Sequence, residues 1–196
     1  QIFVPDKREA VNPNMFSPLA GVAVAEALEN LHHLAPQIKW PNDVLLSGRK
    51  VCGVLVEAFW SANKIQAVVM GVGINVSIGS VPEDSEVIFP ATCIEEHINQ
   101  HADRFELLRE VLRRIASWRP RMHTPEFIQA WQDRLAFMGE MVTIHHPGAE
   151  SQAGVVRGVD QTGNLRLGTQ TGGEILVSHG DVQLVKYYRD QEKPGR

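Results

Sequence analysis

The feature that most limits the fold of this chain is a series of short apolar runs between residues 37 and 76. Because the runs are rich in Val, Ile and Leu and the gaps are short, they predict a meander of neighbouring β-strands. Residues 51–56 and 65–72 are almost continuously apolar, which predicts that both faces of these central strands are covered. Turn-forming residues separate the runs at Pro41-Asn42-Asp43, Ser47-Gly48 and Ser61-Ala62-Asn63.

Helical patterns lie on both sides of this region. Ser17-Pro18 predicts a helix over 18–32, with Ser17 as the N-cap and Pro18 in the first helical position. Thr92 with Glu95, and Asp103 with Glu106, have capping-box spacing and predict two more helix starts. Another helix is predicted to start at Thr124-Pro125. The apolar residues expected to trace one face of a helix are Leu19, Val22, Ala23, Ala27 and Leu31, then Phe105, Leu108, Leu112, Ile115 and Ala116, then Phe127, Trp131 and Leu135.

After Gly139 the helical period stops, and short apolar runs recur about every ten residues with Gly or Asp between them. Five short strands within about 50 residues predict a small closed barrel, because closure removes the edges of a sheet. The boundary between the two parts is expected near residues 137–140. The fold class is therefore predicted as α+β, with a mixed β-sheet flanked by helices and a small β-barrel after it.

Composition excludes several classes of protein. The 196 residues are 43% hydrophobic and 21% charged, as in globular domains, and the net charge of −4 argues against a chain built mainly to bind nucleic acid or anionic lipid. No run is long enough to span a membrane and no signal peptide is evident, so a cytoplasmic protein without membrane contact is expected. Cys52 and Cys93 lack CxxC spacing, and His97 with His101 lacks a third ligand, so no metal site is predicted.

Three segments combine residues suited to chemistry. Lys39-Trp40-Pro41-Asn42-Asp43 fixes a cation and a carboxylate at a strand end, and Lys50 places an ammonium where an apolar strand begins. Gly71-Val72-Gly73-Ile74-Asn75 would let a ligand approach the backbone closely. This last segment is neither a dinucleotide fingerprint nor a Walker A loop, because it lacks the third Gly and the Gly-Lys-Ser/Thr.

In this order and spacing, KWPND, GRKVCGVLVE and GVGIN resemble the catalytic core of the biotin protein ligases. The resemblance continues through Asp103-Arg104 and through residues 157–165, which are typical of the family's C-terminal SH3-like barrel. It implies a class II synthetase-like, or biotin/lipoate ligase-like, core over residues 1–138 and an SH3-like barrel over 139–188. The tail over 189–196 is polar and is expected to be frayed.

The resemblance also implies a two-step reaction. ATP and biotin would give biotinyl-5′-AMP and pyrophosphate with Mg²⁺ accompanying the ATP, and biotin would then pass to a lysine of a biotin carboxyl carrier protein. A fixed ammonium such as Lys50 would offset the repulsion between the biotin carboxylate and the triphosphate. Asp43 would orient Lys50 and help the acceptor amine lose its proton, although Asp at this position could also simply cap its turn.

The resemblance assigns the candidate site residues by role. The expected catalytic pair is Lys50 and Asp43. Arg104 is expected beside the nucleotide, although it could instead be a solvated residue at the start of a helix. The expected biotin-binding residues are Lys50, Gly53, Val54, Leu55, Gly71 and Val72, and the expected nucleotide-binding residues are Lys39, Asn42, Asn75 and Arg104.

Two family features are missing from these residues. The family's Gly-Arg-Gly-Arg-Arg-Gly loop and its Ser/Thr-Thr-Asn segment do not occur, so we expect a ligase that lacks its N-terminal part. The alternative is a truncated, non-catalytic module that still binds biotinyl-adenylate or the acceptor domain, and a lipoate-transferring relative is a further possibility. No helix-turn-helix precedes the core, so DNA binding is not expected, whereas a homodimer is plausible.

Overall fold

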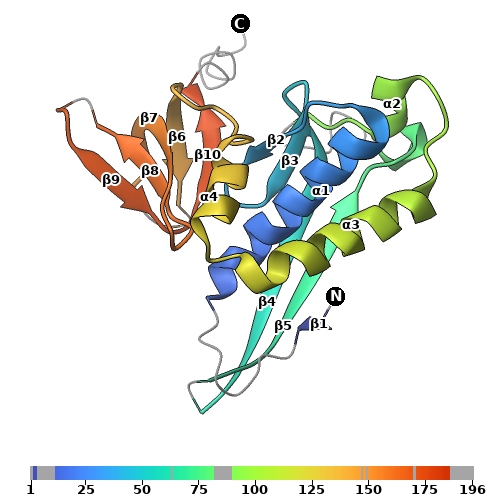
Figure 1. Ribbon diagram of the computed structural model, residues 1–196. Helices are drawn as coiled ribbons and strands as arrows, with labels where there is room; N and C mark the ends of the chain where they lie inside the picture. Colours follow the sequence, from blue (N-terminus) through green and yellow to red (C-terminus); the bar gives the residue numbers. More distant parts are fainter. Residues whose placement is uncertain are drawn as a thin grey trace, which may run out of the picture.

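A computed structural model of the chain describes residues 2–3, 12–62, 64–81, 90–146, 148, 150–169 and 171–185. This part of the chain forms two five-stranded sheets, and the long helices pack on one face of the first sheet (Figure 1). In the first sheet the order is β1-β5-β4-β3-β2. Its strands are β1 Ile2–Phe3, β2 Gln37–Lys39, β3 Asp43–Leu46, β4 Arg49–Ser61 and β5 Lys64–Ile74.

The predicted meander is confirmed, but among the described residues the sheet is antiparallel and not mixed. All four strand pairings of the described residues in the first sheet are antiparallel. From β2 to β5 each strand turns back on the next through a short connection, whereas β1 pairs with β5 from far away in the sequence. Two isolated parallel bridges occur in this part of the chain, from Ile38 to Leu135 and from Lys50 to Ala91.

The helices of the described residues are α1 Phe16–His32, α2 Ile94–Ile98, α3 Arg104–Trp118 and α4 Pro125–Gln132, with 3₁₀-helices η1 Pro13–Met15, η2 Ile78–Ser80 and η4 Arg119–Arg121. The first three turns of α1 are buried on all sides, because the helix lies between the first sheet and α3. The helix predicted from Thr124-Pro125 is confirmed as α4, whose Phe127 and Trp131 are buried.

Two of the predicted helix caps are wrong and one is confirmed. Because η1 continues directly into α1, Ser17 is not the N-cap, and its hydroxyl donates to the carbonyl of Pro41 at 3.0 Å. Thr92 donates to Glu96 instead of forming a box with Glu95, and the residue at the N-cap of α2 is Cys93. Asp103 caps α3 as predicted, with its carboxylate accepting from the Phe105 and Glu106 amides.

The predicted apolar face of α3 is confirmed as buried at Ile115 but wrong at its other positions. Leu107, Val111 and Ile115 form the buried stripe, at i, i+4 and i+8. Phe105 and Leu108 lie beside this stripe and are 70% and 53% exposed. The helix is therefore rotated by about one residue from the predicted orientation, and it leaves several apolar side chains at its margin.

The two faces of β4 and β5 differ in burial. Val54 is 3% exposed, whereas its neighbour Leu55 is 65% exposed. Gly71 and Gly73 of β5 are exposed on the same face as Leu55, away from α1 and α3. The prediction that both faces of these strands are covered is therefore wrong for the described residues, and an open face remains.

The second sheet has the order β10-β6-β7-β8-β9 with antiparallel pairs. Its strands are β6 Met141–His145, β7 Gln152–Val159, β8 Leu165–Gly168, β9 Glu174–Val177 and β10 Asp181–Leu184. The five predicted strands are confirmed. Between the described residues of β9 and β10 there is no closing pair, so barrel closure is not shown, and the tail over 189–196 lies outside the described residues.

Hydrogen bonding passes from the first sheet to the second just after α4. The amide of Ala136 donates to the carbonyl of Ile38 in β2, and three residues later the amide of Gly139 donates to Val156 in β7. Phe137 between them has a left-handed backbone with φ of 63°. The predicted boundary at residue 138 lies between Ala136, which bonds to the first sheet, and Gly139, which bonds to the second.

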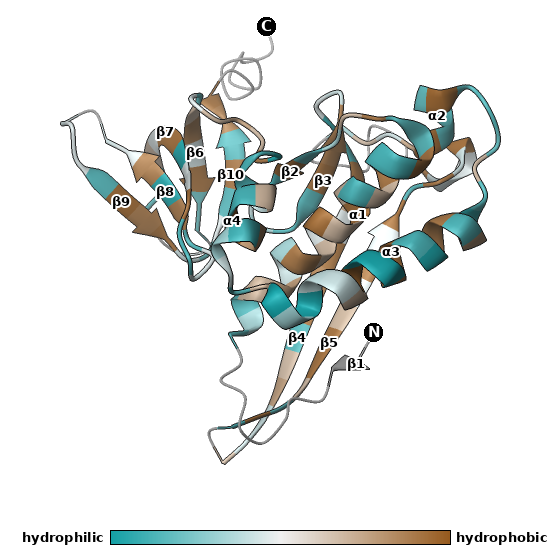
Figure 2. Cartoon of the chain, in the orientation of Figure 1, coloured by the Kyte–Doolittle hydropathy of each residue, from teal (hydrophilic) through white to brown (hydrophobic). Residues whose placement is uncertain are grey.

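Hydrophobic residues concentrate in the strands, and the outer side of α3 is largely hydrophilic (Figure 2). None of the helices in the described ranges has both the length and the hydropathy needed to cross a bilayer.

The indole of Trp40 joins the two sheets. It is 3% exposed, and its Nε1 donates to the carbonyl of Gly163 at 3.0 Å. Trp40→Phe would leave that buried carbonyl unpaired, so we expect a loss of about 1–3 kcal/mol in the free energy of unfolding, measured by urea denaturation. Trp60→Phe is the matched control, because Trp60 is 60% exposed, and equal losses in the two variants would contradict this account.

Candidate functional site

One row of residues crosses four strands of the first sheet. Lys39 of β2 pairs with Asp43 of β3, Asp43 pairs with Gly53 of β4, and Gly53 pairs with Gly73 of β5. Cross-strand partners project from the same face of a sheet. The row therefore carries two charged side chains at one end and a strip of bare backbone at the other.

Lys50 reaches into this row from the start of β4. Its Nζ lies 2.6 Å from Asp43 Oδ1, and its side chain is 38% exposed. A Cβ placed on Gly53 would lie 3.1 Å from this Nζ and 3.0 Å from Cε, closer than ordinary van der Waals contact. The ammonium thus rests on the α-carbon of Gly53, and a larger residue there would displace it.

Asp43 is the buried anion of the site. Its side chain is 10% exposed, and its second oxygen, Oδ2, lies 3.7 Å from Lys39 Nζ. The contact with Lys50 is an ion pair without regular hydrogen-bond geometry. Among the described residues this carboxylate caps no backbone group of its turn, so the geometry favours the electrostatic reading of Asp43 over the turn-capping reading.

The second sheet supplies a further carboxylate. Asp181 Oδ1 in β10 lies 2.7 Å from Lys39 Nζ, and Gln183 donates to the other oxygen of Asp181. Partial burial alone would raise the pKa of Asp181, but the hydrogen bonds from Lys39 and Gln183 hold that pKa below its usual value. Lys50, Asp43, Lys39 and Asp181 thus form one chain of alternating charges, which we call the four-charge chain.

Cys52 lies under this chain. Its thiol is buried, and burial together with the nearby Asp43 carboxylate raises the thiol pKa to about 12, although Lys50 acts in the opposite direction. Such a thiol stays protonated at neutral pH, so Cys52 is a packing residue and not a nucleophile.

The structure divides the predicted biotin-binding residues between the two faces of the sheet. Leu55 and Gly71 pair across β4 and β5 on the open face, two residues along from Gly53. Val54 projects into the core, and Val72 lines a pocket against α3. On the open face these two valines can therefore offer only backbone groups.

The two predicted asparagines hold backbone in place. The side-chain amide of Asn42 donates to the backbone carbonyl of Val54, and the backbone amide of Val54 donates to the backbone carbonyl of Asn42. The side chain of Asn75 donates to the carbonyl of Thr92. These bonds fix the turn before Asp43 and the end of β5, so both residues shape the borders of the site.

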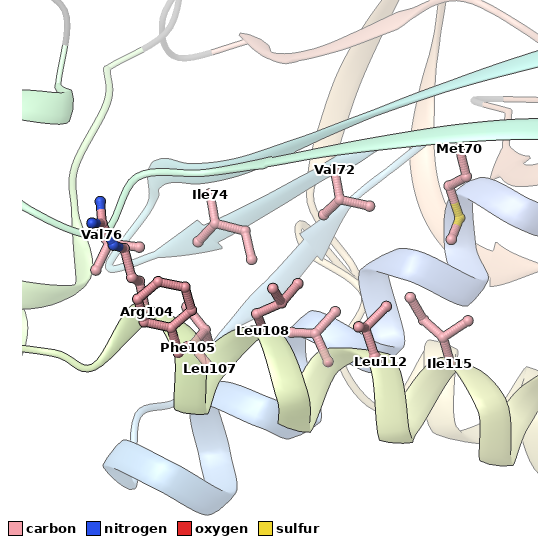
Figure 3. A pocket seen from close by; sticks show the side chains of 11 residues that line it. Met70, Val72, Ile74, Val76, Arg104, Phe105, Leu107, Leu108, Leu112 and Ile115 are labelled. Carbon is pink, nitrogen blue, oxygen red and sulfur yellow. The ribbon is translucent and has the colours of Figure 1, made fainter. Parts of the chain in front are cut away.

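Arg104 lies apart from the four-charge chain. It stands at the start of α3, at the rim of an apolar pocket of about 400 Å³ between α3 and β5. Figure 3 shows Met70, Val72 and Ile74 pointing from β5 toward the leucines of α3. This pocket is on the helix side of the sheet, and within the described part of the chain no hydrogen bond or ion pair joins Arg104 to Lys50.

Another cavity of about 400 Å³ opens where the two sheets meet. Asn42, Leu55 and Trp40 line it from the first sheet, and Gly163 and Ser178 line it from the second. No local pattern in the sequence links Asp181 or Ser178 to the residues of the first sheet. Asp181 contacts Lys39 across 142 residues of chain, and Ser178 lines the cavity.

The arrangement defines a class of protein. Residues 4–75, which include the row and Lys50, match the model of the Biotin/lipoate A/B protein ligase family.

Relatives narrow this class. The chain is 33% identical over 145 residues to the biotin–[acetyl-CoA-carboxylase] ligase of Paracoccus denitrificans, and 34% identical over 169 residues to that of Mycobacterium tuberculosis. The structure of the Aquifex aeolicus biotin protein ligase in complex with biotin and ATP aligns with a TM-score of 0.75 and 30% identity, covering 93% of this chain and 76% of that one. The chain belongs to the biotin protein ligase family.

The match does not extend over the whole of the curated relatives. It covers 71% of this chain and 59% of the Paracoccus protein, and 83% and 59% for the Mycobacterium protein. The chain therefore spans about three fifths of the length of these two relatives.

The seat of Lys50 on Gly53 can be tested directly. Gly53→Ala should leave the fold intact, because the added methyl is crowded only by the flexible end of Lys50 and lies at an ordinary 3.6 Å from Asp43 Oδ1, but it should push Nζ off Asp43. We expect the acetylation rate of Lys50, followed by peptide mass spectrometry, to rise severalfold. Gly71→Ala is the control, because its Cβ would meet only the Leu55 carbonyl at 3.8 Å. An unchanged rate in Gly53→Ala would refute the seat.

Proposed function

We propose that this chain carries the site at which a biotin protein ligase activates biotin with ATP and transfers it to a carrier lysine. The observation that carries the proposal is an ammonium, Lys50, held by a buried carboxylate above a bare glycine strip on an open sheet face. The family membership and the Aquifex relative described with biotin and ATP support the choice of substrates.

In the first step, a carboxylate oxygen of biotin attacks the α-phosphorus of ATP. The bond from that phosphorus to the bridging oxygen breaks, and pyrophosphate leaves with the electron pair. Lys50 lies where it can face both anions, so it reduces their repulsion and stabilises the charge on the pentavalent phosphorus. Asp43 keeps the Lys50 ammonium in place.

In the second step, the amine of a lysine on the carrier domain attacks the carbonyl of biotinyl-5′-AMP, and AMP leaves. The attacking amine must lose a proton. Both oxygens of Asp43 face ammonium groups, at 2.6 and 3.7 Å, so we do not assign Asp43 as the base and assign the proton to solvent.

The binding roles follow from the faces of the sheet. Gly53, Gly71 and Leu55 would form the floor for the apolar part of biotin, and the backbones of Val54 and Val72 would supply hydrogen bonds. Lys39 would contribute positive charge toward the nucleotide while paired with Asp181. Asn42 and Asn75 would shape the nucleotide side, and Arg104 has no contact that supports a direct role.

The residues do not fit a dedicated Mg²⁺ site. The buried Asp43 already faces two ammonium groups, and no cluster of three His, Cys, Asp or Glu residues within the described ranges could hold a metal. Mg²⁺ prefers several oxygen ligands, including phosphates. Mg²⁺ would therefore be held mainly by the phosphates of ATP, and Asp43 would remain paired with the lysines.

The test is formation of biotinyl-5′-AMP, detected by mass spectrometry after incubating the chain with biotin, ATP and Mg²⁺. We expect the adenylate with biotin and none with lipoate or octanoate. Lys50→Ala should reduce the rate by about 100-fold or more, as loss of a preorganised charge does elsewhere. Lys64→Ala, at an exposed lysine of the same hairpin, should leave the rate unchanged.

Other results point elsewhere. Adenylate formation with lipoate but not biotin would assign the chain to lipoate chemistry. If no adenylate forms but biotinyl-5′-AMP binds in calorimetry, and Lys50→Ala weakens that binding, the chain is a non-catalytic binding module. If the chain neither forms the adenylate nor binds biotinyl-5′-AMP, the proposal is contradicted.

A further inference from the structure

Two lysines compete for one buried carboxylate at the site. Asp43 has Lys50 at 2.6 Å from one oxygen and Lys39 at 3.7 Å from the other. The Lys39 side chain is 4% exposed, so water offers it little compensation for its charge. If Lys39 had no other anion nearby, it would be drawn onto Asp43.

Asp181 resolves this competition from the other sheet. It holds Lys39 at 2.7 Å, one ångström closer than Asp43 does, and Coulomb attraction weakens with distance. Gln183, two residues further along β10, donates to the free oxygen of Asp181 and keeps the carboxylate turned toward Lys39. Each lysine therefore has its own carboxylate.

We propose that Asp181 is a positioning residue, which acts through Lys39 to reserve Asp43 for Lys50 and so sets where the Lys50 ammonium stands above Gly53. The inference rests on the proposed function for its consequence in biotin binding, but its geometry does not depend on that function. The second sheet then contributes to the chemistry because Asp181 holds Lys39 away from Asp43, and Asp181 itself need not contact a substrate.

Asp181→Asn should release Lys39 toward Asp43 and loosen Lys50. We expect Lys50 acetylation, followed by peptide mass spectrometry at one fixed pH, to become severalfold faster, and biotin affinity in calorimetry to fall severalfold. Asp181→Glu should restore both values, because it keeps the carboxylate. Glu174→Gln is the matched control, since it removes a carboxylate from an exposed ion pair in the same sheet.

The decisive arm is the same substitution without Lys39. In a Lys39→Met background there is no second ammonium to release, so Asp181→Asn should leave Lys50 acetylation unchanged. If Asp181→Asn changes acetylation equally in both backgrounds, Asp181 acts through the stability of the second sheet and the proposal is overturned. It is also overturned if acetylation does not respond in the native background or if Asp181→Glu fails to rescue it.

The two proposals can fail separately. If the native chain binds no biotin, but Lys50 acetylation still responds to Asp181 only when Lys39 is present, the ligase proposal falls and the positioning role stands. If Lys39→Met does not fold, judged by circular dichroism, Lys39→Gln serves in its place, and the rescue by Asp181→Glu decides the result independently.

Discussion

The arrangement of the site depends on the burial of one charge, the carboxylate of Asp43. A buried carboxylate without a partner is strongly destabilising, so the surrounding chain must bring cations to it. The tight turn between β2 and β3 puts Lys39 opposite Asp43 in register, and β4 carries Lys50 to the other oxygen. Three consecutive strands are thus tied to one anion, which explains why a lysine, a turn and a second lysine stand so close in the sequence.

The same sheet separates two environments. On the helix side Val54 is buried and Val72 faces α3, while on the other side Gly53, Gly71 and Gly73 leave the backbone uncovered. A strand normally carries side chains on both faces, but here three positions of the open face are glycines, with Leu55 as the large side chain among them. This gives a flat floor beneath the Lys50 ammonium, where a ligand can approach the backbone closely.

The sequence predicts what depends on local pattern, and fails where distant contacts decide. The strands between residues 37 and 76 and the Asp103 cap follow from turn residues, apolar runs and capping chemistry. The buried stripe of α3 could not be fixed, because apolar residues lie on both candidate stripes and only packing against the sheet chooses between them. Asp181 could not be recognised as a partner of Lys39, since 142 residues separate them and no periodicity links them.

The four-charge chain has consequences for how an anion can bind. Two lysines and two aspartates sum to zero, so the chain does not attract anions by net charge. Lys50 ends the chain on the open face and is 38% exposed, whereas Lys39 and Asp43 are almost fully covered. An incoming carboxylate or phosphate must therefore share Lys50 with Asp43, and its gain depends on how firmly Asp43 already holds that ammonium. Under the proposed function, whatever sets the Asp43–Lys50 distance also sets the affinity for the biotin carboxylate and the phosphates, so the proposed role of Asp181 makes the second sheet part of the site.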